Sequence, residues 1–269
     1  NVWKFPYMAG QGGGGAFVLF YLLFLLILGL PIMTMEFAVG RASQKSPVKA
    51  YYALEKPGQK WHIHGYITLI GCYLLMMFYT TVAGWMLHYF YLTATGKFTG
   101  LDSDAVASQF NTMLSQPQVM GFWMVIIVIV GILVCSIGLQ NGLEKVTKVM
   151  MISLLFIMVI LAINSFFMDG AKEGLSFYLI PDFERMKEIG IIKTITGAMN
   201  QAFFTLSLGI GAMSIFGSYI GKERSLLGES LNIALLDTFV AITSGLIIFP
   251  ACFTFHVDQT SGPGLIFIT

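Results

Sequence analysis

The stretch Gln201-Ala202-Phe203-Phe204-Thr205-Leu206-Ser207-Leu208-Gly209-Ile210-Gly211 decides the fold, because it sets polar and flexible residues in the middle of an apolar segment. Two glycines, a serine and a threonine at that depth predict a membrane helix that unwinds. Unwound backbone is tolerated inside a membrane only where protein buries it or where it lines a cavity. The alternative is a packing face of small residues. That alternative explains the glycines but not Gln201, Thr205 and Ser207, so we favour a functional break.

The composition around this stretch is that of a membrane protein. The 269 residues are 56% hydrophobic and 11% charged, with a mean hydropathy of +0.77. A soluble domain carries about 25% charged residues, so a soluble enzyme is excluded. The net charge of +1 gives no basic field for nucleic acid. The three cysteines lie in apolar runs without metal-ligand spacing, which favours their role as small core residues.

The chain contains six apolar stretches that are long enough to cross a bilayer, which takes roughly 20 residues. They run at about 14–40, 65–95, 119–139, 146–168, 192–220 and 230–256. The opening segment, from Asn1 to Gly10, is apolar but only half a span long, and the run Gly12–Gly15 reads as a tight turn. We therefore expect an all-α membrane protein, a helical bundle that forms one transmembrane domain over residues 1–269.

Loop charges orient the spans, since basic residues are enriched on the cytoplasmic side. Between residues 41 and 64, five basic residues face one acid, Glu55. The loops predicted to be cytoplasmic are 41–64, 140–148 and 221–229. The loops predicted to face outside are 97–118, 169–191 and 257–269. Segment 44–62 is expected to form a short basic helix at the inner interface, and 169–191 a solvated outer loop.

Three further polar residues lie within spans, where each is a functional candidate because its burial is costly. Asp237 is expected to hold a cation, or else to reach water near the cytoplasmic end of its span. Glu36 is expected to accept hydrogen bonds from a broken neighbouring helix, or else to extend to the inner interface. Tyr79 has a substrate carboxylate as one possible partner, although a bond to a neighbouring carbonyl is the more common arrangement.

The opening residues form another candidate site. Asn1 offers an uncharged oxygen at the start of a half-helix, whose free N–H groups suit a carboxylate, and Lys4 lies one turn further out. A frayed terminus is the alternative. The chain begins without methionine and stops within an apolar phrase, Gly264 to Thr269. We therefore expect a piece of a longer protein.

These features together resemble the neurotransmitter:sodium symporter family. The resemblance extends over the whole chain and is carried by Asn1-Val2-Trp3-Lys4-Phe5-Pro6-Tyr7, by Gly13-Gly14-Gly15-Ala16-Phe17 and by Phe203-Phe204-Thr205-Leu206-Ser207-Leu208-Gly209. It implies a twelve-helix fold of two inverted repeats with broken helices. The chain would cover the outer half of the first helix through the seventh, and the C-terminal half of the protein would be missing.

The resemblance also implies an ion site. The Na⁺ ligands would be Asn1, Thr205 and Asp237, together with the substrate carboxylate. Most members of the family have asparagine at the position of Asp237. In chloride-dependent members an anion lies near the positions of Tyr21, Gln201 and Ala241. Ala241 lacks the hydroxyl group that such an anion needs, whereas Asp237 supplies a fixed negative charge, so transport independent of chloride is expected.

A substrate site and a gate follow from the same resemblance. The residues implied at the substrate are Leu75, Tyr79, Phe203, Phe204, Ser207 and Ile210. Leu75 and Ile210 would contact the substrate side chain, and because both are apolar the resemblance implies a neutral, hydrophobic L-amino acid. Phe204 would close over the substrate, and Lys4 would stand in the outer gate where arginine is usual. Glu36 and Gln201 are expected to be structural polar residues. A second sodium site cannot be completed, because its hydroxyl ligands belong to a helix beyond this chain.

The predicted function is therefore Na⁺-coupled amino-acid symport by alternating access, in a multi-pass protein of a bacterial inner membrane. The alternative is a channel or a non-transporting membrane subunit, which would need a polar stripe along several spans. A membrane-embedded enzyme is not expected, because neither a nucleophile–base pair nor an HExxH motif is apparent.

Overall fold

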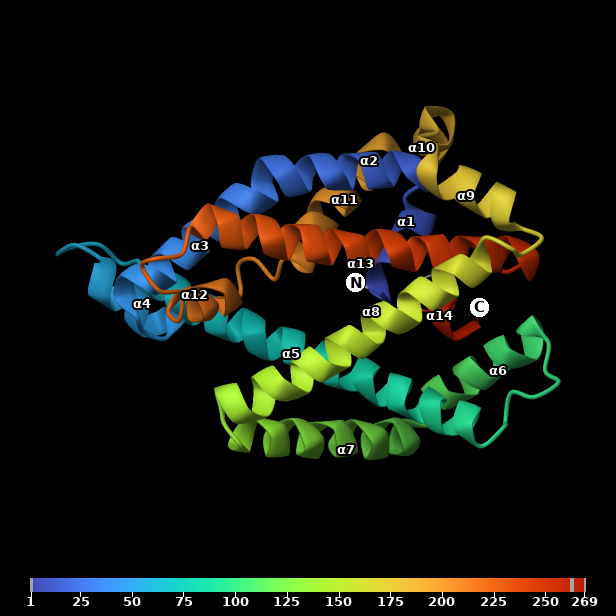
Figure 1. The fold of residues 1–269 in the computed structure, drawn as a ribbon, viewed down its shortest axis with the longest axis horizontal. Helices are drawn as coiled ribbons and strands as arrows, with labels where there is room; N and C mark the ends of the chain where they lie inside the picture. The colour runs from blue at the N-terminus through green and yellow to red at the C-terminus, as the bar shows by residue number, and fades with distance from the viewer. Residues whose placement is uncertain (1, 262–263, 269) are drawn as a thin grey trace. The chain divides into compact units, whose positions relative to one another are not determined.

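The computed structural model describes residues 2–261 and 264–268, and throughout these ranges the regular structure is helical (Figure 1). The elements, in chain order, are α1 (Lys4–Gln11), α2 (Gly15–Phe24), the π-helical turn η1 (Leu25–Gly29), α3 (Leu30–Ser43), α4 (Pro47–Leu54), α5 (His62–Ala94), α6 (Ser103–Leu114), α7 (Pro117–Ser136), the π-helical turn η2 (Leu139–Glu144), α8 (Lys145–Ser165), α9 (Ala171–Leu179), α10 (Phe183–Ile189), α11 (Ile191–Thr205), α12 (Ala212–Gly217), α13 (Leu226–Thr254) and α14 (Leu265–Ile268).

Within the described ranges, five helices are long and apolar enough to cross a membrane. They are the continuous α2–η1–α3 segment, α5, α7, the segment from Gly142 to the end of α8, and α13. Their bounds agree with five of the six predicted spans to within a few residues. The sixth predicted span, 192–220, is divided into α11 and α12, as the polar residues at its centre predict.

The chain separates into two compact units, whose relative placement the structure does not fix. Unit 1 contains residues 1–75 and 175–245, and unit 2 contains residues 76–174 and 246–269. The prediction of a single transmembrane domain stays a prediction.

In unit 1, α2, η1 and α3 follow one another as a long interrupted helix that packs against α11 and α12 (Figure 1). α11 contacts α2, and α12 contacts α3. Two glycines allow the second contact. A Cβ at Gly40 would collide with the carbonyl oxygen of Ser214, and one at Gly217 would lie 2.7 Å from the Cα of Phe37. The two backbones therefore touch, as small residues permit between membrane helices.

The turn between α1 and α2 requires its glycines. Gly14 has φ +71°, and a Cβ there would collide with the carbonyl oxygen of Phe177 at the end of α9. A residue with a side chain would therefore meet both backbone strain and a steric clash. This tight turn agrees with the prediction for residues 12–15.

The prediction of a solvated loop at 169–191 is wrong. The segment folds into α9 and α10, and within it Tyr178 is fully buried and Met186 nearly so. The Tyr178 hydroxyl donates to the carbonyl oxygen of Ile242 over 3.2 Å. Charged and apolar residues alternate in this segment, and Tyr178 and Met186 fall on the buried faces of its two short helices.

Unit 2 carries an aromatic cluster near the C-terminal end of α5. Tyr89 lies 4.8 Å from Phe267 between ring centroids, and Phe110 stacks on Phe267 at 5.0 Å. Trp85 meets Phe110 edge to face at 5.9 Å. The cluster joins α6, which lies within a predicted outer loop, to α5 and α14. Asp102 caps α6 by accepting a hydrogen bond from the Ala105 N–H over 2.9 Å.

Candidate functional site

The candidate site of unit 1 surrounds the break between α11 and α12. α11 ends at Thr205 and α12 begins at Ala212. Three residues between them have positive φ angles: Ser207 at +52°, Gly209 at +82° and Gly211 at +75°. A non-glycine residue with positive φ costs on the order of 1–2 kcal/mol, so the surrounding contacts must hold Ser207 in this conformation. The backbone is unwound where the polar stretch of the sequence predicts it.

Hydrogen bonds fix the unwound backbone from both sides. The N–H groups of Ser207 and Leu208 donate to the carbonyl oxygens of Phe204 and Phe203, each over 3.1 Å. On the α12 side, the Gly209 N–H donates to Glu36 Oε1 on α3 over 2.7 Å. This is the contact expected of Glu36, a carboxylate that accepts from the freed N–H of a broken neighbouring helix. Its second oxygen, Oε2, is buried and has no hydrogen-bond partner among the described residues.

Asp237 on α13 lies at the α11 end of the break. The Thr205 hydroxyl donates to Asp237 Oδ2 over 2.7 Å. Asp237 is half-buried and follows the first residue of α13 by eleven residues, or about 16 Å along the axis. At that depth the carboxylate lies near the middle of a 29-residue membrane helix. The position favours the ion-binding interpretation over access to water at the helix end.

Tyr21 on α2 completes this group of side chains. It is fully buried, and Asp237, Thr205 and Thr238 are its polar neighbours. Within the described residues its hydroxyl oxygen is buried and has no hydrogen-bond partner. Thr238 is the residue that sequence reasoning missed. The available signal was a second polar residue directly after Asp237 within an apolar span.

Lys4 and Phe204 meet beside the last turn of α11. Lys4 Nζ lies 3.1 Å from the centroid of the Phe204 ring, close enough for a cation–π interaction. Lys4 belongs to α1 and Phe204 to the last turn of α11. The two residues that the sequence assigns to a gate are thus in contact.

Ile210, an apolar candidate of unit 1, lies at the α12 end of the break. A Cβ at Gly71 would lie 3.8 Å from Ile210, so Ile210 packs against α5 one turn before Leu75. Phe203 and Ser207 are half-buried beside the break. These residues are in position to line a small site with mixed apolar and hydroxyl character.

Other predicted residues stand apart from this group. Asn1 lies outside the described residues. Tyr79 belongs to unit 2, so its role toward a substrate stays a prediction. Gln201 and Ala241 are fully buried in unit 1.

The chemistry of the group suits a monovalent cation. Over residues 2–261 and 264–268, no three His, Cys, Asp or Glu side chains gather as a transition-metal site would require. The group instead offers one carboxylate, hydroxyl oxygens and the carbonyls at the end of α11. Oxygen ligands of this kind favour hard cations.

A broken helix with a carboxylate at the break is an arrangement that ion-coupled membrane transporters use at their binding sites. The sequence model of the Sodium:neurotransmitter symporter family matches residues 1–112 and 104–269. The chain belongs to this family, and it is an integral membrane protein of a sodium-dependent transporter family rather than a member of an enzyme class.

Three comparisons illustrate the relationship. The chain is 36% identical over 266 residues to an uncharacterized sodium-dependent transporter, YhdH, of Bacillus subtilis, covering 99% of this chain and 58% of that protein. It is 25% identical over 278 residues to the mouse sodium-dependent neutral amino acid transporter B(0)AT2, covering 93% and 37%. The crystal structure of MhsT in complex with L-phenylalanine matches with a TM-score of 0.92 and 37% identity, covering 100% of this chain and 60% of that one. The chain thus spans less than two thirds of these relatives.

Proposed function

We propose that the protein containing this chain transports a neutral, hydrophobic L-amino acid together with Na⁺, by alternating access to a site at the break between α11 and α12. The observation that carries the proposal is the bond from Thr205 to Asp237 beside unwound backbone at mid-membrane depth. Family membership supports the use of Na⁺. Two relatives support the substrate class: the structure of MhsT holds L-phenylalanine, and B(0)AT2 is named for neutral amino acids.

In this proposal the first Na⁺ is bound by Asn1, Thr205 and Asp237, with the substrate carboxylate as a further ligand. Sodium then binds tightly only when substrate is present, and by linkage the substrate binds tightly only with sodium. Tyr79 would bind the substrate carboxylate, and Ser207 with the carbonyls near Phe204 would bind the amine. Leu75, Phe203 and Ile210 would contact its apolar side chain.

Asp237 also supports transport without chloride. Its carboxylate places a fixed negative charge among Tyr21, Thr205 and Thr238. A bound chloride in the same small volume would be repelled, since like charges within a few ångströms of each other are costly at low dielectric.

Uptake into liposomes tests the proposal directly. The full-length protein is reconstituted, and uptake of labelled L-phenylalanine is measured with an inward Na⁺ gradient, with K⁺ in place of Na⁺, and with gluconate in place of chloride. We expect uptake to require Na⁺ and to persist in gluconate. Uptake that is equal with K⁺ rules out symport, and uptake that is lost in gluconate rules out chloride independence.

The contact between Lys4 and Phe204 gives a second prediction. In Lys4→Met the length and apolar stem of the side chain are kept and the cation is lost. A cation–π interaction contributes about 0.5–2 kcal/mol, so we expect bound substrate to dissociate roughly two- to thirtyfold faster, as measured by release of labelled amino acid from the purified protein. Lys4→Arg, which keeps the charge, is the matched control and should stay near wild type. Unchanged release from Lys4→Met would remove Lys4 from the gate.

A further inference from the structure

The segment 44–61, here called the basic loop, joins α3 to α5 and contains α4. It presents four lysines to solvent, all of them exposed: Lys45, Lys49, Lys56 and Lys60. Arg41 precedes it in the last turn of α3. Glu55 is its one acid. The loop therefore has a strong positive charge.

Glu55 is turned inward, so it does not neutralise this surface. Its side chain is 13% exposed. Its carboxylate accepts the His62 N–H over 3.0 Å and lies 2.8 Å from His62 Nδ1 at the start of α5. Desolvation raises the pKa of Glu55, but the hydrogen bonds and charge of His62 lower it more, and the net shift is downward. The ionised Glu55 carboxylate therefore caps the start of α5. The charged side chains on the exposed face of the loop are the lysines.

The basic loop lies where two membrane-spanning segments end. α3 and α5, which flank it, both belong to candidate spans. Two amphipathic aromatic side chains accompany the lysines, Tyr52 at 50% exposure and Trp61 at 58%. Aromatic residues of this kind are enriched at the level of lipid headgroups, and basic amphipathic segments bind anionic lipid there.

α4 is also in direct contact with the broken helix. A Cβ at Gly211, the last residue of the break, would lie 2.8 Å from Pro47 Cγ at the start of α4. A Cβ at Gly65 on α5 would lie 2.7 Å from the Cα of Val48. Burial, and after it the charge of Glu36, raise the pKa of Tyr51 on α4, so this helix lies within the electrostatic range of the carboxylate that binds the break. A displacement of α4 would therefore change the packing at Gly211 and the electrostatic interaction with Glu36.

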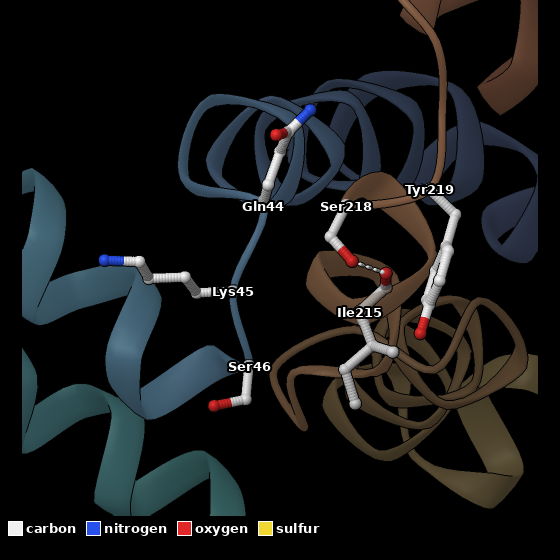
Figure 2. Close-up of a pocket in the computed structure, with 6 residues that line it drawn as sticks. All are labelled: Gln44, Lys45, Ser46, Ile215, Ser218 and Tyr219. Atoms are coloured by element: carbon white, nitrogen blue, oxygen red, sulfur yellow. Dashed lines mark hydrogen bonds between the residues drawn. The ribbon is translucent and has the colours of Figure 1, made fainter.

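Beside these contacts, a cavity of about 290 Å³ separates the first residues of the loop from α12. Gln44 and Ser46 line it on one side, and Ser218 and Tyr219 on the other (Figure 2). Figure 2 shows the Lys45 side chain extending away from Ser218 and Tyr219, so its amine points out of the cavity. The cavity gives the start of α4 room to shift, and the cation faces the surroundings.

We propose that the basic loop is a docking surface for the anionic phospholipid headgroups of the membrane, and that docking sets the position of α4 against the broken helix and so the rate of transport. The effect on rate rests on the proposed function, whereas the docking itself does not. Two observations favour anionic phospholipid headgroups as the ligand. The loop is positively charged, and it lies at the ends of two membrane spans. Each lysine at an anionic surface contributes on the order of a fivefold gain in binding.

Docking is tested on the full-length protein, which is purified from mixed micelles of phosphatidylcholine and phosphatidylglycerol. The quantity measured is the amount of phosphatidylglycerol that remains bound per protein. The test variant is K45Q/K49Q/K56Q/K60Q. The matched control, K97Q/K172Q/K187Q/K193Q, removes the same charge from lysines outside the basic loop. We expect the test variant to retain less than half of the phosphatidylglycerol that wild type and control retain. Equal retention by all three proteins overturns the proposal.

The effect on rate is measured by Na⁺-driven uptake in liposomes with 0, 20 and 40% phosphatidylglycerol. We expect wild type and control to gain at least threefold between the extremes, with a smaller gain at 0.5 M salt because salt screens the lysines. The test variant should keep its uptake in pure phosphatidylcholine and lose the gain. A full gain in the test variant overturns the link to transport. An absence of Na⁺-driven uptake in every lipid would instead count against the proposed function, while retention still tests docking.

Discussion

Asp237→Asn is expected to reduce amino-acid uptake at least tenfold in chloride-free medium and to make the remaining activity rise with chloride. The substitution keeps an oxygen in the position that accepts the Thr205 hydroxyl over 2.7 Å, but it removes the negative charge. Interactions with a charged group contribute about 1.5–3 kcal/mol, so the apparent affinity for Na⁺ should fall roughly 10- to 150-fold.

Chloride should then supply part of the missing charge. The asparagine side chain would leave Tyr21, Thr205 and Thr238 without the carboxylate that now lies among them. The measurement is initial uptake against Na⁺ concentration in gluconate and in chloride. Glu184→Gln, on an exposed outer carboxylate paired with Lys187, is the matched control and should leave both curves unchanged. Wild-type curves for Asp237→Asn would remove Asp237 from the ion site.

Gly40→Ala is expected to be the most damaging small substitution between α3 and α12. The added methyl group would collide with the carbonyl oxygen of Ser214, a backbone atom that cannot rotate away as a side chain can. Forced overpacking costs about 1–3 kcal/mol. We expect the full-length protein in detergent to unfold several degrees lower and to lose most of its uptake, because α12 is the inner half of the broken helix.

Gly131→Ala provides the control for this prediction. Gly131 lies within α7, and a Cβ there would have no described atom within 4 Å. Alanine is a better helix former than glycine by about 1 kcal/mol, so this variant should be as stable as wild type or more so. The same fall in unfolding temperature for both variants would contradict the contact between α3 and α12.

The break between α11 and α12 could be predicted from the sequence, because polar residues are costly in lipid. Their presence within one apolar segment can be recognised without knowledge of the rest of the fold. The same reasoning led to Glu36, since a freed N–H group in a membrane must find an acceptor. The depth of Asp237 was harder to judge, because α13 begins at Leu226, several residues before the predicted start of the span at 230. Charged residues at helix ends obscure such boundaries.

Other features depend on packing and could not be predicted from the sequence. The need for glycine at positions 40 and 217 follows from the contact between α3 and α12, which the sequence of either helix does not show. Tyr178 packs against α13, and its hydrogen-bond partner there, Ile242, lies 64 residues later in the chain. The π-helical turn η1 replaces α-helix in a uniformly apolar run, whose composition does not distinguish one hydrogen-bond register from the other.

The π-helical turn has a mechanical consequence when it is considered with the unwound segment. A Cβ at Gly29, the last residue of η1, would lie 2.8 Å from Leu206 Cδ1, at the start of the break. The α2–α3 helix and the α11–α12 helix therefore both lose regular i→i−4 hydrogen bonds where they contact each other. Their stiffness is lowest in a single plane, with α2 and α11 on one side of it and α3 and α12 on the other. Because the two irregular stretches are in contact, we expect a bend at one of them to be accompanied by a bend at the other.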